Sequence, residues 1–492
     1  MKNLKITGIY GFLLQFILSI VTVVFVVKLN VLPAFYIIFI VFILLFLLFI
    51  SGVFVIARSK PRVAIGTVFS FLTTILLGVV TFVYLLPTIN TLEKITLGAD
   101  TYISTYYVVV KKDDVATKPE DIKDYQIGVE KSHDFDAMEK ALNKIAKEYN
   151  HTLNVTAYDN YISMWEAFMN RSETGAILME TNYYGIYKDS YEEDGDNISN
   201  HVKIIGHYDV EMHNEGVNNP PPEKDLTVQP FTVYISGIDL EGNINQKSRS
   251  DVNIVAAINP VTHKIALVTV PRDAYVKFPG VTGDSYDKLT HAAIYGKNDC
   301  SVSIATLEQN VYTGIHIDYW MRVNFTSLKK IVDVLGGIEA YSAYSYTSTF
   351  SGTDYYFEKG MNYMDGEKAL VFCRERKTLK GGEEQRGRNQ LEVIKGIFNK
   401  AISPSIITNY NSLLAEVDDC ILTNMPQEAM TELIKMQIDD GSAWSFETAS
   451  VAVEYDYDYC YSMPGNKYCI GRMDEESRQA ATDLIKNTLK SK

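Results

Sequence analysis

Three long hydrophobic stretches at the N-terminus constrain this chain more than any other feature. Lys28 is the only charged residue between positions 7 and 57, and positions 63 to 92 hold none. A helix needs roughly 20 apolar residues to cross a bilayer. We therefore predict membrane spans at about 6–27, 32–57 and 63–86. A cleaved signal peptide would be shorter and followed by soluble sequence, and three buried core helices would rarely be so long and so free of charge.

The basic residues beside these stretches predict which side of the membrane each end occupies. Lys2 and Lys5 precede the first span, three basic residues crowd the loop at 58–62, and the first loop holds only Lys28. Short cytoplasmic loops retain Lys and Arg. We therefore expect a cytoplasmic N-terminus in the cell membrane, with the chain from about 93 onward outside the cell.

The composition of the whole chain limits its partners. Its 492 residues include 60 Asp and Glu against 46 Lys and Arg, a net charge of −14. This balance argues against nucleic-acid binding, which requires a surplus of basic residues. All five cysteines lie beyond the spans, and their odd number leaves at least one unpaired. An oxidising exterior would permit a bridge between Cys460 and Cys469.

The sequence divides into four predicted segments. These are the spans at 1–92, a small accessory α/β domain with its linker at 93–225, a larger α/β domain at 229–403, and a C-terminal accessory tail at 404–492. The accessory domain is indicated by strands alternating with helices between 124 and 207, and the linker by the NNPPP run at 218–222. This alternation looks like one lobe of a periplasmic solute-binding protein, but we favour a spacer or a partner-docking module.

Apolar strands and amphipathic helices define the larger domain. The expected elements are strands at 231–240, 251–260 and 264–271 and helices at 301–311, 325–335 and 385–401. The last two strands should pair as a hairpin through the NPVTHK turn. The pattern predicts a three-layer α/β domain, with a mixed central sheet flanked by helices.

Charged residues stand at the ends of these strands, where a core strand would usually end in a neutral turn. They are Asp239, Arg249, Asp251, Arg272 and Asp273. Further along, Arg374 and Arg376 are two positions apart, so on a strand both guanidinium groups would point to one face. Arg386 and Gln390 lie one helical turn apart and share a face, whereas Arg388 points elsewhere.

The joint pattern of these residues favours an anion site. A lone Asp or Arg is more often a cap or a surface ion pair of little energetic value. Several arginines that face one place repel each other unless an anion lies among them, and Arg is suited to bidentate contact with phosphate. Two nearby carboxylates likewise repel unless they share a cation, and Mg²⁺ commonly bridges carboxylates to substrate phosphates. We therefore predict a metal-assisted pyrophosphate site on the outer face of a membrane.

The stretch from 233 to about 401 resembles the LytR-CpsA-Psr family of cell-wall phosphotransferases. The motifs that carry the resemblance are GIDLEG, SRSDVNIVAAINP, VTVPRDAYVKFPG, YDKLTHAAIYG, GIHIDYWMRVNF, KKIVDVLGGIEA, VFCRERK and QRGRNQ. The N-terminal spans and the intermediate domain look like those of streptococcal capsule-type members. The resemblance implies transfer of a glycopolymer, with its proximal phosphate, from a polyprenyl pyrophosphate carrier to a peptidoglycan sugar hydroxyl, as in capsule or teichoic-acid attachment. It also implies a hydrophobic tunnel for the lipid tail.

The resemblance also implies roles for individual residues. Asp239 and Asp251 would bind Mg²⁺ or Mn²⁺ and would form the catalytic set with Arg249. The pyrophosphate would be held by Arg249, Arg272, Lys288, Arg374, Arg376, Arg386 and Gln390. A Ser or Cys nucleophile is not expected, because phosphoryl transfer is catalysed chiefly by positioning and charge neutralisation. The base that accepts the proton of the acceptor hydroxyl stays open.

Two other functions are compatible with parts of the sequence. A regulatory protein of the transcriptional-attenuator type could bind the polyprenyl pyrophosphate without turning it over. The intact pair of Asp239 and Asp251 favours the enzyme, because capture of the lipid alone would need the arginines but no metal. A solute receptor acting through residues 124–207 is the other alternative, and it would require a ligand for that segment.

Overall fold

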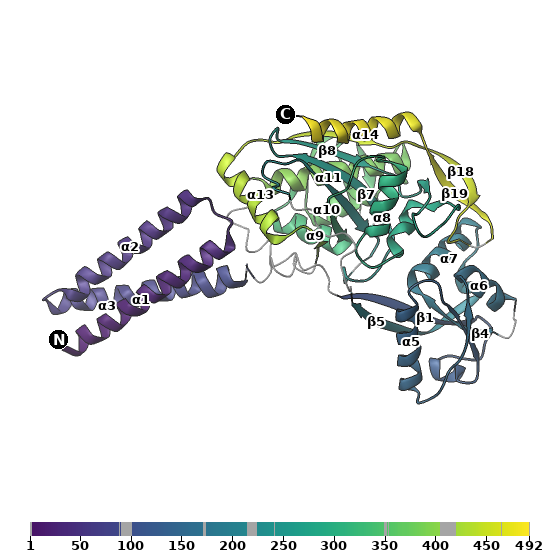
Figure 1. Ribbon diagram of the computed structural model, residues 1–492, viewed down its shortest axis with the longest axis horizontal. Helices are drawn as coiled ribbons and strands as arrows, with labels where there is room; N and C mark the ends of the chain where they lie inside the picture. The colour runs from purple at the N-terminus through teal and green to yellow at the C-terminus, as the bar shows by residue number, and fades with distance from the viewer. Residues whose placement is uncertain are drawn as a thin grey trace.

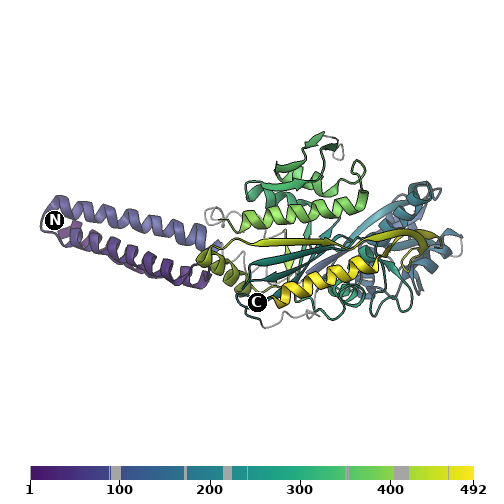
Figure 2. The ribbon, with the colours of Figure 1, turned by 90° about the horizontal axis from the view of Figure 1, so that it is seen from above.

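The computed structural model describes residues 2–87, 89, 101–170, 174–213, 224–240, 242–348, 352, 354–403, 420–463 and 465–491. The structure has three parts: an N-terminal helical bundle, a larger α/β body and a smaller accessory α/β body. Along the long axis the larger body lies between the bundle and the accessory body (Figures 1 and 2). The predicted linker at 218–222 lies outside the described residues.

The N-terminal bundle has a polar inside and an apolar outside. Its helices are α1 (Lys2–Leu29), α2 (Ala34–Ile56) and α3 (Lys60–Val79), the last continuing into the π-helical turn Val80–Leu85. Inside, Ser51 donates a hydrogen bond to Gln15 (2.6 Å), and the hydroxyls of Thr22 and Thr81 lie 2.8 Å apart. Large apolar side chains are exposed outside, an arrangement that suits lipid surroundings. The three predicted helices are confirmed, each with the length and composition of a membrane span.

The accessory body is a five-stranded sheet in the order β3-β2-β4-β1-β5. Its strands are β1 (Thr101–Lys111), β2 (Gln126–Glu130), β3 (Asn154–Tyr158), β4 (Thr174–Glu180) and β5 (Val202–His213), and its helices are α5 (Phe135–Glu148), α6 (Tyr161–Met169) and α7 (Thr181–Glu193). Helix α5 packs on one face, and α6 and α7 pack on the other. The predicted alternation at 124–207 is confirmed. Strand β1 was not predicted, because it is buried on both faces and lacks polar alternation.

The larger body contains a mixed six-stranded sheet in the order β16-β11-β6-β7-β8-β17. Its strands are β6 (Phe231–Ile238), β7 (Ser250–Asn259), β8 (Lys264–Thr269), β11 (Tyr319–Asn324), β16 (Leu422–Thr423) and β17 (Ser445–Ser450). The predicted hairpin is confirmed, with Asn259 opposite Lys264. Strands β11 and β17 run parallel to β6 and β8, respectively, so both sheet directions are present.

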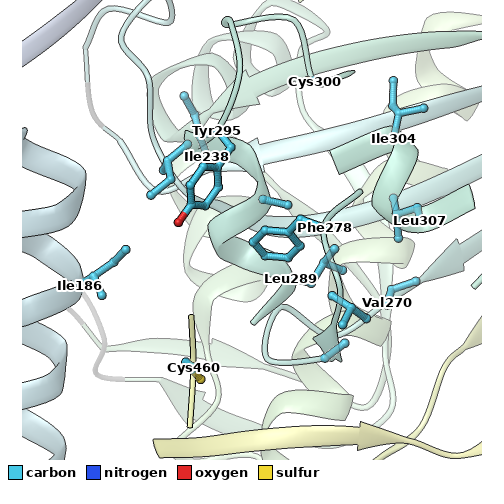
Figure 3. Packing of buried hydrophobic residues seen from close by; sticks show 14 of the residues in the cluster. Ile186, Ile238, Val270, Phe278, Leu289, Tyr295, Cys300, Ile304, Leu307 and Cys460 are labelled. Carbon is cyan, nitrogen blue, oxygen red and sulfur yellow. The ribbon is translucent and has the colours of Figure 1, made fainter. Parts of the chain in front are cut away.

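Helices cover both faces of the central sheet and make the three predicted layers. They are α8 (Ser301–Asn310), α9 (Phe325–Val334), α10 (Gly366–Arg374), α11 (Gly382–Ala401), α13 (Gln427–Asp440) and α14 (Glu475–Lys490). Helices α8 and α14 share a buried core with α7 of the accessory body. Ile186 of α7 belongs to the same cluster as Ile238, Phe278 and Leu289 (Figure 3). On the other face, α11 and α13 pack against the alternate side chains of β6, β7 and β8.

Short ribbons complete the larger body. They are β9 (Tyr275–Val276) with β10 (Asp287–Lys288), β12 (Ile338–Ser342) with β15 (Gly360–Met364), β13 (Tyr346–Ser348) with β14 (Tyr355–Phe357), and β18 (Val453–Tyr459) with β19 (Lys467–Met473). The five cysteines are free thiols, so the bridge that the sequence permits between Cys460 and Cys469 is not formed.

The C-terminal segment belongs to the central sheet and is not a tail packed outside it. Strand β17 pairs with β8 along its whole length, β16 pairs with β11, and α14 packs on β7 and β8. This corrects the predicted tail at 404–492, of which 404–419 lies outside the described residues. The edges of β8 and β11 would otherwise expose unpaired backbone groups. The other predicted domain boundaries stay predictions.

Candidate active site at the charged end of the central sheet

An apolar cavity of about 780 Å³ lies between the central sheet and helices α9, α11 and α13. Alternate side chains of each strand turn to the same face of a sheet. The apolar wall includes Phe231, Val233 and Ile235 of β6, Ile265 and Leu267 of β8, Ile331 of α9, Ile394 and Phe398 of α11, and Leu433 of α13. Branched and aromatic side chains therefore line this space.

One end of this cavity is charged. The register places Ile238 opposite Ser250 and Ile254 opposite Thr269, so the end of β6, the start of β7 and the end of β8 meet at one edge. Helix α10 ends and α11 begins beside this edge. Seven of the nine residues predicted for the site line the same cavity: Asp239, Asp251, Arg272, Arg374, Arg376, Arg386 and Gln390.

The local structure around Arg374 differs from the prediction. VFCRERK was expected to be a strand, but Gly366–Arg374 is helix α10, whose start is capped by Asp365 accepting the Lys368 N–H (2.9 Å). Its apolar residues form the buried face of a helix, which overrides the strand pattern. Arg376 lies two residues beyond the helix end. Both arginines still reach the cavity, from a helix terminus and the turn after it.

Ion pairs connect the arginines to the two aspartates. Arg272 Nη1 lies 2.8 Å from Asp251 Oδ2, and the Thr290 hydroxyl donates to Asp251 Oδ1 (3.4 Å). Arg374 Nη2 lies 3.7 Å from Asp239 Oδ1, and the Arg374 guanidinium stacks 3.9 Å above the Phe325 ring. Thr290 was missed by the sequence analysis, although it stands in the YDKLTH motif two residues after Lys288.

The first turn of α11 brings Arg386 to the same edge. Arg386 forms an ion pair with Glu383 in the preceding turn, and Gln390 donates to the Cys373 carbonyl (3.3 Å). A Cβ on Gly387 would lie 3.2 Å from the Thr269 side chain, so glycine permits the close approach of α11 to β8. Arg388 is half-exposed and pairs with Glu384, as expected for a side chain that points elsewhere.

The two aspartates have different electrostatic surroundings. Burial raises the pKa of Asp239, and the nearby charge of Asp251 raises it further, so it stays above its ordinary value despite Arg374. Burial also disfavours the charged form of Asp251, but Arg272, Arg386 and Arg249 outweigh burial and hold its pKa below the ordinary value. Asp251 is therefore the firmly charged member of the pair, and Asp239 is the stronger base.

The two remaining predicted residues form ion pairs with the accessory body. Arg249 forms an ion pair with Asp189, and Lys288 Nζ lies 3.0 Å from Glu193; both carboxylates are on α7. Neither Arg249 nor Lys288 lines the cavity, although the charge of Arg249 acts on both Asp239 and Asp251. Arg249 therefore lies near the charged end of the cavity without lining it, and no pattern in the sequence indicated the α7 carboxylates.

The residues present fit a hard divalent cation that is shared with a phosphate ligand. Mg²⁺ usually takes one or two protein carboxylates and fills its remaining positions with water and substrate oxygens. Asp239 and Asp251 line the same cavity, and the charge of Asp251 raises the pKa of Asp239, so a cation held by both would relieve this repulsion. Within the described residues, no group of three or more His, Cys, Asp or Glu side chains is arranged to hold a metal ion by itself.

The fold and the site together define a class of protein: a chain with three helices of membrane-spanning type that carries an apolar cavity ending in arginines and aspartates. The family named LytR_cpsA_psr matches residues 194–478, more than half of the chain. The protein therefore belongs to the LytR-CpsA-Psr family, as the sequence motifs predicted.

Several proteins with assigned names are similar to this chain. A polyisoprenyl-teichoic acid–peptidoglycan teichoic acid transferase, TagU of Enterococcus faecalis, is 32% identical over 266 residues, which cover 54% of this chain and 81% of that protein. The protein of the same name from Bacillus subtilis is 33% identical over 214 residues, or 43% and 66% of the two chains. Among solved structures, Bacillus subtilis TagV gives a TM-score of 0.45 at 23% identity, covering 54% of this chain and 98% of TagV. The structure of TagT bound to LIIa-WTA gives a TM-score of 0.44 at 24% sequence identity, covering 56% of this chain and 98% of TagT.

Proposed function

We propose that this protein is a membrane-anchored phosphotransferase. It moves a glycopolymer, with its proximal phosphate, from a polyprenyl pyrophosphate carrier to a peptidoglycan sugar hydroxyl. The observation that carries this proposal is the single cavity that joins a long apolar space to a cluster of four arginines and two aspartates. A polyprenyl pyrophosphate has the same two parts, an apolar chain and a doubly charged head. The related transferases, whose names specify a polyisoprenyl-linked polymer and peptidoglycan, support the same substrates.

In the proposed reaction, residues of the chain stabilise charge on the phosphates and accept a proton. The acceptor hydroxyl oxygen attacks the phosphorus next to the glycopolymer, the bond from that phosphorus to the bridging oxygen breaks, and polyprenyl monophosphate leaves. Arg272, Arg374 and Arg386 neutralise charge on the transferred and leaving phosphates. The acceptor proton must go to a base. Burial and Asp251 raise the pKa of Asp239, so this carboxylate would accept the proton while it does not hold a cation, because a bound cation lowers its pKa again.

A divalent cation, Mg²⁺ or Mn²⁺, completes the proposed site. Asp239 and Asp251 would hold it, and when bound it supplies positive charge that binds pyrophosphate oxygens and lowers their negative charge in the transition state. The proposed orientation puts the N-terminus in the cytoplasm and the α/β bodies outside the cell membrane, as the basic residues of the short loops favour. The polymer is of the teichoic-acid or capsule type.

The test starts from the full chain purified in detergent. Lipid extraction and mass spectrometry are expected to find polyprenyl phosphate or pyrophosphate with the wild type. Arg376→Ala removes a charged hydrogen-bond donor at the head group, so retention and transfer should each fall by at least about tenfold. Arg388→Ala is the matched control, because Arg388 pairs with Glu384 away from the cavity. Full transfer by Arg376→Ala would refute the site, and bound lipid without transfer to peptidoglycan in any condition would favour a regulator.

A further inference from the structure

A second and larger cavity lies between the accessory body and the larger body. Its volume is about 1280 Å³. One wall is the end of β2, the turn before α5 and the start of α6. The other wall is formed by the segments around 280–285, 295–297 and 461–462. No step of the proposed transfer uses this interdomain cleft.

Aromatic rings line much of the interdomain cleft. The His133 ring lies 5.4 Å from that of Tyr183 and 5.0 Å from that of Tyr295, centroid to centroid. Tyr161 stacks on Tyr183 at 3.8 Å, and Tyr461 lies 6.3 Å from Tyr295. Tyr461 is 41% exposed at the rim of the cleft. Such amphipathic rings offer an apolar face and a polar edge to the same ligand.

One of these rings carries a hydroxyl that lacks a hydrogen bond of normal geometry. Tyr295 is only 6% exposed, and its hydroxyl interacts with that of Tyr183 but makes no hydrogen bond of normal geometry within the described residues. In Figure 3 its oxygen points away from Phe278 and lies on the side of the helix that carries Ile186. Buried hydroxyls are normally hydrogen-bonded, and an exception requires an explanation. A ligand in the cleft that Tyr295 lines would provide one.

The charges around the cleft indicate what kind of ligand fits. Its lining holds five carboxylates, Glu130, Asp134, Asp136, Glu139 and Asp159, and two ammonium groups, Lys140 and Lys297. Lys247 pairs with Asp134 (3.0 Å) and Lys131 pairs with Asp159 (2.7 Å), so the five carboxylates are nearly balanced by ammonium groups. Burial lowers the pKa of His133 to about 3, so the imidazole is neutral at physiological pH. The cleft therefore offers a polyanion such as a poly(glycerol phosphate) no excess of positive charge, whereas uncharged hydroxyl and acetamido groups can donate to its carboxylates.

The interdomain cleft is connected to the candidate active site by one short helix. The 3₁₀ helix η4 spans Leu289–Ile294. Thr290 at its start contacts Asp251, and Tyr295 directly after its end lines the cleft. The lining of the cleft therefore begins one six-residue helix away from the group that contacts Asp251.

We propose that the interdomain cleft binds an uncharged oligosaccharide, of the N-acetylated class that forms glycan strands, and that it positions the acceptor for transfer. This inference deepens the proposed function and rests on it for the acceptor role. The Tyr295 hydroxyl hydrogen-bonds the sugar, Tyr461 stacks on a pyranose face, and the carboxylates accept from sugar hydroxyls.

The binding test uses the full chain in detergent and three probes: an N-acetylglucosamine tetramer, soluble glycan strands released from peptidoglycan by amidase, and poly(glycerol phosphate). Calorimetry is expected to show saturable binding of the first two probes only. Tyr295→Phe keeps the ring and removes one hydroxyl, so affinity should fall about fivefold with an unchanged unfolding midpoint. Tyr312→Phe is the matched control, because Tyr312 is another buried tyrosine whose hydroxyl makes no hydrogen bond of normal geometry within the described residues, but it lies outside the cleft lining.

The outcomes separate this inference from the proposed function. A cleft that binds neither neutral glycan, prefers the phosphate polymer, or binds equally well with Tyr295→Phe overturns the inference, even where the wild type transfers polymer. If glycan binding depends on Tyr295 but no polymer is transferred, the binding site stands and the proposed function fails. Where both hold, Tyr295→Phe should raise KM for the glycan acceptor about fivefold and leave kcat and lipid retention unchanged.

Discussion

Asp239 and Asp251 stand at the same edge of the sheet but respond differently to charge removal. Asp251→Asn leaves Arg272 without its 2.8 Å partner among several cations, so at pH 7 the domain should lose about 2 kcal/mol and its unfolding midpoint should fall. Asp239→Asn removes a charge that burial and Asp251 already disfavour, so the midpoint should stay or rise. Both variants should lose transfer. Equal destabilisation by the two would contradict this electrostatic assignment.

The stability that the charge of Asp251 contributes depends on pH. The pKa of Asp251 is lowered in the folded protein, so its charge contributes stability above the ordinary carboxyl pKa, and this contribution is lost as the pH falls through the folded pKa. Thermal unfolding of wild type and Asp251→Asn should therefore differ at pH 7, and the difference should begin to shrink below about pH 4 and vanish below the folded pKa of Asp251. A difference that persists undiminished at pH 3 would mean that the substitution acts through packing.

How far single residues could be predicted depended on whether their partners are local. Arg386 and Gln390 share a helix face because the helical period fixes it, and the structure agrees. The strand expected for Arg374 and Arg376 was wrong, because the apolar residues of 366–374 are buried as a helix whose Asp365 cap the pattern did not weigh. Asp189 lies 60 residues from Arg249 in sequence, and Glu193 lies 95 from Lys288. No local pattern reports contacts between such distant residues.

At the scale of elements, helix α7 of the accessory body forms ion pairs with two residues near the candidate active site. Asp189 and Glu193 are one turn apart on it and hold Arg249 and Lys288. Arg249 is predicted from the sequence to bind the pyrophosphate, and Asp189 would then compete for it. Asp189→Asn should therefore strengthen binding of polyprenyl pyrophosphate about threefold, a modest factor because Asp189 is 44% exposed. Glu192→Gln is the control, since Glu192 pairs only weakly with exposed Lys188 (3.8 Å). Weaker lipid binding in Asp189→Asn would show instead that the carboxylate positions Arg249.

Three of the strands that the sequence analysis missed have no clear strand signal of their own. Strand β1 lacks polar alternation, and β16 and β17 are short or weakly apolar strands whose partners β11 and β8 lie far away in the chain. Their strand character comes from completing an existing sheet. The hairpin β7–β8 and helices α8, α9 and α11 could be predicted because their own periodicity and end signals specify them.

At the scale of the whole molecule, the apolar end of the cavity lies next to the helical bundle. The end of α1, including Phe25 and Leu29, shares a cluster with Ile434 and Ile438 of α13. Met430 of α13 belongs both to this cluster and to the core beside the cavity. The ribbon views show α13 on the bundle side of the larger body (Figures 1 and 2).

The direction of the cavity follows from the strand register. Phe446 of β17 pairs with Ile265 of β8, and Ile265 pairs with Ile258 of β7, at the opposite end of the sheet from Asp251. Phe446 and Leu433 of α13 line the cavity there. In the proposed function, a lipid would therefore enter the apolar end beside α13 and place its head group at the charged end.

This arrangement predicts that lipid retention is controlled from α13, far from the charged groups. Leu433→Trp places a large ring in the apolar end of the cavity, so the amount of co-purified polyprenyl lipid should fall severalfold while the charged end stays intact. Ile438→Trp changes the same helix on its bundle side, outside the cavity lining, and should retain lipid. Mass spectrometry of extracted lipid, with thermal unfolding to verify folding, measures both. Equal loss in the two variants would mean that α13 acts by holding the bundle and not as a wall of the lipid site.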